Sequence, residues 1–131
     1  MSSSRSDDDR RAAGMEVRRA VLGDAHVDRA EERKTAFSAG FQDFITRTAW
    51  GEAWTRETLS RRERSLMTLA ILAALRSDEL EIHVRGAVNN GLSDEEIAEA
   101  LLHATVYAGA PAGNKAFAIA QRVLDELGRG R

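Results

Sequence analysis

Apolar and polar positions recur along this chain with the 3.6-residue spacing of amphipathic helices, which predicts a compact bundle of about six helices. Residues 15–22 form one such segment, which should end at Gly23, and residues 24–32 form a second, more polar one. No segment alternates convincingly with the period of two that a half-buried strand requires. The pattern therefore predicts an all-α fold.

The middle of the chain carries its most apolar segments. Phe37, Phe41 and Phe44 recur at i, i+4 and i+7, which predicts one apolar face on a helix that frays soon afterwards. Residues 66–75 are apolar almost all round the helix predicted over residues 61–76. A helix without a polar face belongs inside a bundle, so we expect this helix at its centre.

A serine followed three residues later by glutamate indicates a helix start, because hydroxyl and carboxylate then satisfy free backbone amides. Two such capping boxes are Ser60 with Glu63 and Ser93 with Glu96. Between them, Asp78 is expected to cap a helix that ends at Gly91. Pro111 separates the last two predicted helices and suits the first turn of the final one.

The length of 131 residues predicts one domain, because a second core would need roughly 50 residues of its own. Residues 1–13 hold almost no apolar side chain, so we expect a disordered tail there and an ordered domain at residues 14–128. We see neither a signal peptide nor an apolar run of membrane-spanning length, and we expect a cytoplasmic protein.

Composition excludes several kinds of chemistry. The sequence has no cysteine, which removes disulfides, thiolate metal sites and thiol-based redox mechanisms. Its three histidines, His26, His83 and His103, lack the compact spacing of a metal motif such as H-E-x-x-H. A formal net charge of −2 gives no general attraction to nucleic acid or to a membrane surface. We therefore expect no metal, nucleic-acid or membrane partner.

Two groups of polar residues recur in steps of four and so share a helix face. Glu79 and His83 form the first, in which a carboxylate orients an imidazole and favours its protonated form, as a general acid requires. The alternative is an ordinary surface pair that only supports the helix. Glu99, His103 and Tyr107 form the second, which indicates either structural hydrogen bonds or a binding pocket.

Arginines cluster at the start of the predicted central helix, where the helix dipole disfavours cations. They are Arg56, Arg61, Arg62 and Arg64. Carboxylate binding by guanidinium groups is one reason for such a cluster. We interpret Arg61 and Arg62 as surface residues beside acidic neighbours, whereas Arg64 adjoins the apolar run and is expected to point inward. Trp50 and Trp54, four residues apart, indicate core packing or a subunit interface.

Five segments of this chain, in order and spacing, resemble the carboxymuconolactone decarboxylase family, and the match runs from about Gly14 to Leu127. They are residues 49–56 (AWGEAWTR), 62–70 (RERSLMTLA), 79–83 (ELEIH), 90–97 (NGLSDEEI) and 103–111 (HATVYAGAP). The wider alkyl hydroperoxidase D-like superfamily uses a Cys-x-x-Cys-x-x-x-His motif for redox work. With His83 as that histidine, the cysteine positions fall on Arg76 and Glu79, so redox activity is excluded.

The resemblance implies an alkyl hydroperoxidase D-like helical fold and decarboxylation of a carboxylated muconolactone in bacterial aromatic degradation. It also implies a homotrimer or homohexamer, with the pocket near subunit contacts. Such a lactone can accept the electrons that departing CO₂ leaves behind, so we expect no cofactor.

On this basis we assign His83 as the proton donor, Glu79 as its orienting partner and Arg64 as a cation for the substrate. The residues expected to bind substrate are Arg56, Trp54, His103 and Tyr107. Two alternatives stay open: a non-catalytic binding or accessory member of the family, and a reaction on another lactone or keto acid.

Overall fold

The computed structural model describes residues 4–129, and these residues form seven α-helices, one π-helix and no strand. The all-α prediction is confirmed. The chain divides into two compact units, Met1–Leu59 and Ser60–Arg131. The single ordered domain expected at residues 14–128 stays a prediction. Within the described residues, no helix is both long enough and apolar enough to cross a membrane.

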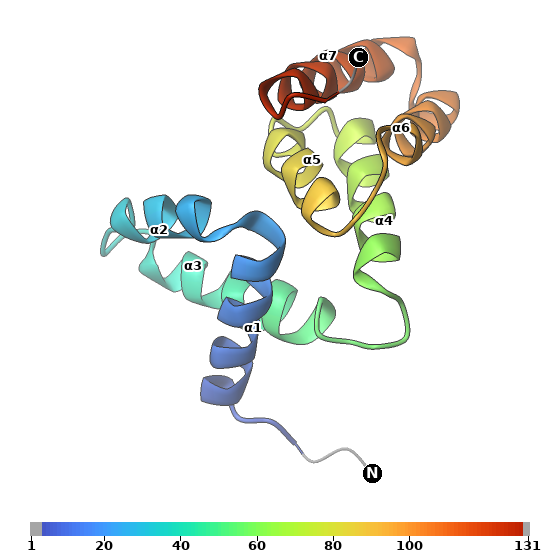
Figure 1. Ribbon diagram of the computed structural model, residues 1–131. Helices are drawn as coiled ribbons and strands as arrows, with labels where there is room; N and C mark the ends of the chain where they lie inside the picture. The colour runs from blue at the N-terminus through green and yellow to red at the C-terminus, as the bar shows by residue number, and fades with distance from the viewer. Residues whose placement is uncertain (1–3, 130–131) are drawn as a thin grey trace. The chain divides into compact units, whose positions relative to one another are not determined.

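The first unit, drawn from blue to blue-green in Figure 1, contains three α-helices and the π-helix. They are α1 (Asp7–Leu22), α2 (Asp24–Glu32), α3 (Ala39–Ile45) and η1 (Thr46–Ala53). α1 packs mainly against η1, and α2 packs back on α1. The buried apolar side chains of this unit include Val17, Val21, Val27 and Trp50.

α1 begins at Asp7, so the disordered tail predicted at residues 1–13 is wrong for residues 7–13. Ser6 and Asp9 form a capping box, in which each side chain accepts a backbone N–H of the other at 3.1 Å. Arg10 then donates to the carboxylate of Glu52 in η1 at 3.1 Å. The prediction of disorder rested on the low apolar content of residues 1–13, which gives no information about an ion pair with a residue 42 positions away. Residues 1–3 lie outside the described part of the chain.

α3 runs directly into η1, so the fraying expected after the phenylalanine stripe is also wrong. Threonine hydroxyls support this continuation, because Thr46 Oγ1 donates to Gln42 O at 2.9 Å and Thr48 Oγ1 to Phe44 O at 2.7 Å. π-Helical turns are rare and frequently lie at functional sites. The apolar stripe of Phe37, Phe41 and Phe44 is exposed in the single chain, at 100%, 62% and 52% respectively.

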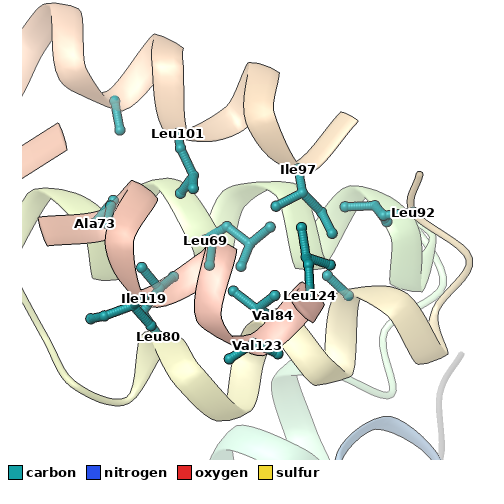
Figure 2. Close-up of a cluster of buried hydrophobic side chains, with 14 residues drawn as sticks. Leu69, Ala73, Leu80, Val84, Leu92, Ile97, Leu101, Ile119, Val123 and Leu124 are labelled. Carbon is teal, nitrogen blue, oxygen red and sulfur yellow. The ribbon is translucent and has the colours of Figure 1, made fainter. Parts of the chain in front are cut away.

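The second unit, drawn from green to red, is a four-helix arrangement around one apolar core. Its helices are α4 (Arg61–Ala74), α5 (Leu80–Asn89), α6 (Asp94–Ala108) and α7 (Ala110–Glu126). α4 contacts each of the other three. Figure 2 shows side chains from all four helices converging on this core, among them Leu69, Val84, Ile97, Leu101 and Val123.

Local helix signals in the second unit are mostly confirmed. Both capping boxes form as predicted, and Pro111 lies in the first turn of α7. Asp78, however, does not cap α5: Glu79 occupies the N-cap without a side-chain cap, and Ser77 Oγ accepts the N–H of Glu79 at 3.1 Å. A short turn therefore precedes α5 where a capped helix start was expected.

α4 is not buried all round, which corrects the expectation for the central helix. Leu69 and Ala73 are buried in the core, whereas Met67, Ile71 and Leu75 are 44%, 57% and 70% exposed. Three neighbouring helices of the unit cover one side of α4 and leave these apolar side chains outside. One apolar face of α4 therefore packs in the core of its unit, and the other apolar face is exposed in the single chain.

Candidate functional site

Arg64 and His83 lie on two neighbouring helices of the second unit. The Ser60–Glu63 box fixes the start of α4, which places Arg64 in its first helical turns, half-buried. Asn90 Nδ2 donates to Ser65 Oγ at 2.8 Å, so the end of α5 lies beside the start of α4. His83 precedes Asn90 by seven residues, which corresponds to about 10 Å along the helix axis. The two candidates therefore lie at different levels of one helical pair.

The Glu79–His83 spacing corresponds to one helical turn. His83 N–H donates to the Glu79 carbonyl at 3.3 Å, so the two residues occupy the first turn of α5. His83 is half-buried and Glu79 is exposed. The imidazole is therefore the better shielded member of the pair, and the orienting role of the Glu79 carboxylate stays a prediction.

The polar face of α6 points outward in the single chain. Glu99, His103 and Tyr107 are all exposed. The rings of His103 and Tyr107 stack at a tilt, with centroids 5.3 Å apart and planes inclined by 43°. Their neighbour Val106 is 73% exposed as well. These side chains therefore do not serve as hydrogen-bonding partners inside the core of their own unit.

The arginines separate by their surroundings, largely as the sequence suggested. Arg62 donates to the Gly91 carbonyl and to the Glu96 carboxylate, which ties α4 to the start of α6. The acidic partner of Arg62 is thus Glu96, which is remote in sequence, and Arg62 has a structural role. Arg61 is exposed, and Arg64 is the half-buried member of the α4 group.

The two tryptophans belong to the first unit. Trp50 in η1 is only 5% exposed, and Trp54 at the end of η1 is half-buried. Their ring centroids are 5.2 Å apart with planes inclined by 32°. Core packing is therefore confirmed for Trp50. Trp54 is followed by the exposed Arg56, so both predicted binding residues of this unit lie where η1 ends.

Sequence reasoning missed a buried cation in the first unit. Arg18 is only 6% exposed, and its guanidinium donates to Gln42 Oε1 at 3.4 Å and lies 3.7 Å from Glu31. Burial lowers the pKa of Arg18 below its usual value, and Glu31 opposes that effect. The signal was present in the sequence, because Arg18 lies between Val17 and Val21 on the apolar face of α1.

Two cavities among residues 4–129 lie away from the candidate residues. One, of about 410 Å³, lies between α6 and α7 and is lined mainly by apolar side chains that include Leu101, Phe117 and Leu124. The other, of about 220 Å³, lies in the first unit and is lined by polar residues that include Lys34 and Asp43. None of the candidate catalytic or binding residues lines either cavity. Among residues 4–129, no group of three His, Asp or Glu side chains could hold a metal ion.

Comparison with known proteins places these residues in context. A model of the carboxymuconolactone decarboxylase family matches residues 39–122. A 4-carboxymuconolactone decarboxylase from Acinetobacter baylyi is 48% identical over 93% of this chain and 92% of its own length. A nitrosuccinic acid decarboxylase from Metarhizium robertsii is 41% identical over 87% of this chain and 80% of its own length. The chain therefore belongs to the carboxymuconolactone decarboxylase family.

Proposed function

We propose that this chain is a carboxy-lyase that converts 4-carboxymuconolactone to 3-oxoadipate enol-lactone in the protocatechuate branch of aromatic degradation, without a cofactor. The observation that carries the proposal is the 48% identity to the Acinetobacter baylyi enzyme of that name over nearly the whole of both chains. The candidate residues all lie inside the range that the family model matches.

The chemistry requires little from the protein. The carbon that loses CO₂ carries both a carboxylate and a carboxymethyl group, and it is part of an unsaturated lactone ring. When its bond to CO₂ breaks, the electron pair moves through the ring double bond onto the lactone carbonyl oxygen. A proton then enters at the ring carbon next to that carbonyl. The protein must hold an anionic substrate, stabilise the developing oxyanion and supply the proton.

His83 is the proposed proton donor, with Glu79 orienting it, because it is a half-buried imidazole on a regular helix. Arg64 is the proposed cation, and its partial burial strengthens its interaction with an anion. It should bind the carboxymethyl arm or the lactone oxygen, since a cation on the departing carboxylate would oppose CO₂ loss. Arg64 and His83 lie on α4 and α5, two helices of the same unit that contact each other.

Arg56, Trp54, His103 and Tyr107 complete the proposed substrate-binding set. Trp54 offers an aromatic face and Arg56 a second guanidinium for a dianion. The ring stacking of His103 and Tyr107 holds two hydrogen-bonding side chains together on the exposed face of α6.

A second candidate substrate class comes from the Metarhizium robertsii relative, whose name states that it decarboxylates nitrosuccinic acid. When the carbon that bears the nitro group loses CO₂, the nitro oxygens accept the electron pair directly, whereas the lactone carbonyl accepts it through the ring double bond. Both substrates are dicarboxylic acids that contain their own electron acceptor. The same cation and proton donor would therefore serve a nitro dicarboxylate.

The test is to mix purified protein with 4-carboxymuconolactone, in buffer with a metal chelator and no cofactor, and to follow substrate absorbance and released CO₂. Loss of substrate with matching CO₂ supports the decarboxylase. Nitrosuccinic acid is assayed in parallel. The substrate with the larger kcat/KM then identifies which of the two substrate classes the protein prefers. Binding of the lactone without turnover would instead favour an accessory protein of the family.

We further propose a cytoplasmic homotrimer or homohexamer that acts on a small carboxylated lactone. Large apolar side chains exposed in the single chain support self-association, because such patches usually mark interaction surfaces. They include Phe37 and Phe41 in the first unit, and Leu75, Val106 and Tyr107 in the second.

A further inference from the structure

The end of η1 is held by a hydrogen-bond network that begins before α1. Arg5 Nη2 donates to the Gly51 carbonyl at 2.9 Å and to Thr55 Oγ1 at 3.2 Å. Thr55 Oγ1 in turn donates to the same Gly51 carbonyl at 2.9 Å. Carbonyl groups at a helix end lack partners within the helix, so the guanidinium supplies a donor where one is needed. Arg5 thus forms one closed network with Gly51 and Thr55, which lie 46 and 50 residues further along the chain.

Arg5 is itself held in place by the start of α1. Its backbone carbonyl accepts from Arg10 Nη1 at 2.6 Å. Glu52 lies 3.6 Å from Arg5 Nη2 and accepts from Arg10 Nε at 3.1 Å. The two arginines therefore share one carboxylate of η1, and the Ser6–Asp9 capping box fixes the turn between them.

The same region of α1 and η1 is in backbone contact, which leaves the network little freedom. A Cβ atom added to Gly51 would lie 2.2 Å from the Arg10 carbonyl oxygen, closer than atoms can approach. Close backbone approach of this kind transmits a displacement of one helix to the other. The position of Arg5 is thus coupled to that of the last turn of η1.

Thr55 lies between Trp54 and Arg56, the two residues of this unit that the proposed function assigns to substrate binding. Their backbone amides point back into η1, since Trp54 N–H donates to Ala49 O at 2.9 Å and Arg56 N–H to Ala53 O at 3.3 Å. We propose that Arg5 is a positioning residue, which bridges Gly51 and Thr55 and so fixes the segment that presents Trp54 and Arg56 to the substrate. This inference rests on the proposed function for the role of those two residues.

The experiment compares full-length Arg5→Ala and Thr55→Val variants with an Arg29→Ala control. Arg29 is exposed on α2 in the same unit, so the control makes the same change of charge away from the network. Steady-state kinetics with 4-carboxymuconolactone gives the first readout. Acrylamide quenching of fluorescence gives the second, because the chain has two tryptophans and both lie in this region.

We expect Arg5→Ala to raise KM by about 5- to 30-fold, as loss of one or two hydrogen bonds would, with kcat changed less than about twofold. Arg5→Lys, which keeps the charge and can bind one of the two acceptors, should recover part of this loss. Because Arg5 and Thr55 belong to one network, the double variant should be scarcely worse than Arg5→Ala alone. Arg29→Ala should match the unmodified protein.

Wild-type kinetics in Arg5→Ala, or an effect equal to that of Arg29→Ala, overturns the inference and leaves the proposed function intact. If the unmodified protein has no turnover, the proposed function fails. The acrylamide quenching measurement alone then tests whether Arg5 positions the segment that contains the tryptophans. Greater tryptophan quenching in Arg5→Ala than in Arg29→Ala then supports the positioning role, and equal quenching refutes it. Should Arg5→Ala fail to fold, Thr55→Val, which keeps the side-chain volume, decides by the same criteria.

Discussion

Gly14 of α1 and Gly51 of η1 are in direct backbone contact. A Cβ atom on Gly14 would lie 2.8 Å from the Gly51 nitrogen and 2.1 Å from the Thr46 carbonyl oxygen. Neither neighbour is a flexible side chain that could move aside. The crossing of α1 and η1 therefore depends on the absence of a side chain at both positions, and Trp50 is buried in the same π-helix.

Gly14→Ala should destabilise the protein by about 3 kcal/mol or more, because the methyl group must displace backbone atoms. The matched control is Gly40→Ala within α3, where nothing lies within 4 Å of an added Cβ. This control should be neutral or stabilising by up to about 1 kcal/mol, since alanine favours a helix over glycine. Urea unfolding followed by tryptophan fluorescence measures both, and equal stabilities would contradict the contact.

Arg64→Ala should lower kcat/KM for 4-carboxymuconolactone by about 10- to 100-fold, the usual effect of removing a hydrogen bond to a charged group. Arg61→Ala removes the same charge from the same helical turn, but at an exposed position, and should leave kcat/KM nearly unchanged. Initial rates at low substrate concentration measure both variants. Equal losses would show that general charge, rather than Arg64, attracts the substrate.

His83→Gln should reduce kcat by about 10²- to 10⁴-fold, because glutamine retains hydrogen bonding but cannot donate a proton at neutral pH. Glu79→Gln should have a smaller effect, through the orientation of the imidazole. A thermal unfolding curve verifies that each variant is folded. Near-normal turnover in the His83 variant would remove this residue from the role of acid.

Asp43 predicts a pH dependence of stability. Hydrogen bonds from Arg11, and then from Arg47 Nε at 2.7 Å, lower the pKa of the Asp43 carboxyl from 3.8 to about 2. A lowered pKa in the folded state means that the stabilisation is complete above about pH 4 and is lost as pH falls towards 2.

The Tm difference between the unmodified protein and an Asp43→Asn variant should therefore be constant above about pH 4 and shrink towards zero near pH 2. Differential scanning calorimetry across this range measures it. A difference that does not change with pH would show that the carboxylate charge contributes nothing to folding.

Val106→Glu should weaken self-association, because it places a charge in the exposed apolar face of α6 without disturbing the core. Size-exclusion chromatography with light scattering should show the unmodified chain as a multiple of 14.4 kDa and the variant shifted towards that mass. An unmodified protein that is already monomeric would refute the proposed oligomer.

Much of the helical pattern could be predicted because its signals are local. Gly23 ends α1, and the serine–glutamate boxes start α4 and α6 within a few residues of chain. The start of α1 was missed although Ser6 and Asp9 carry the same kind of signal, since the composition of the segment was given more weight. Its stabilising partner Glu52 lies more than 40 residues away, and no local pattern reports such a pair.

The candidate site could be predicted as residue types but not as geometry. The four-residue spacing of Glu79 and His83 correctly predicted that they lie one helical turn apart. The exposure of His103 and Tyr107 depends instead on which helices cover α6, and the sequence of α6 alone does not show this. The network of Arg5 was not predicted, because its two acceptors lie 46 and 50 residues further along the chain and no local pattern links them to Arg5.

Among the described helices, three start at a serine that is paired with an acid three residues later, at Ser6, Ser60 and Ser93. Each start is thus encoded in four consecutive residues. At Ser60 and Ser93, insertions or deletions upstream would shift neither the register of the helix nor the side chains that it buries. Chimeras joined just ahead of these two serines should therefore keep each helix in phase.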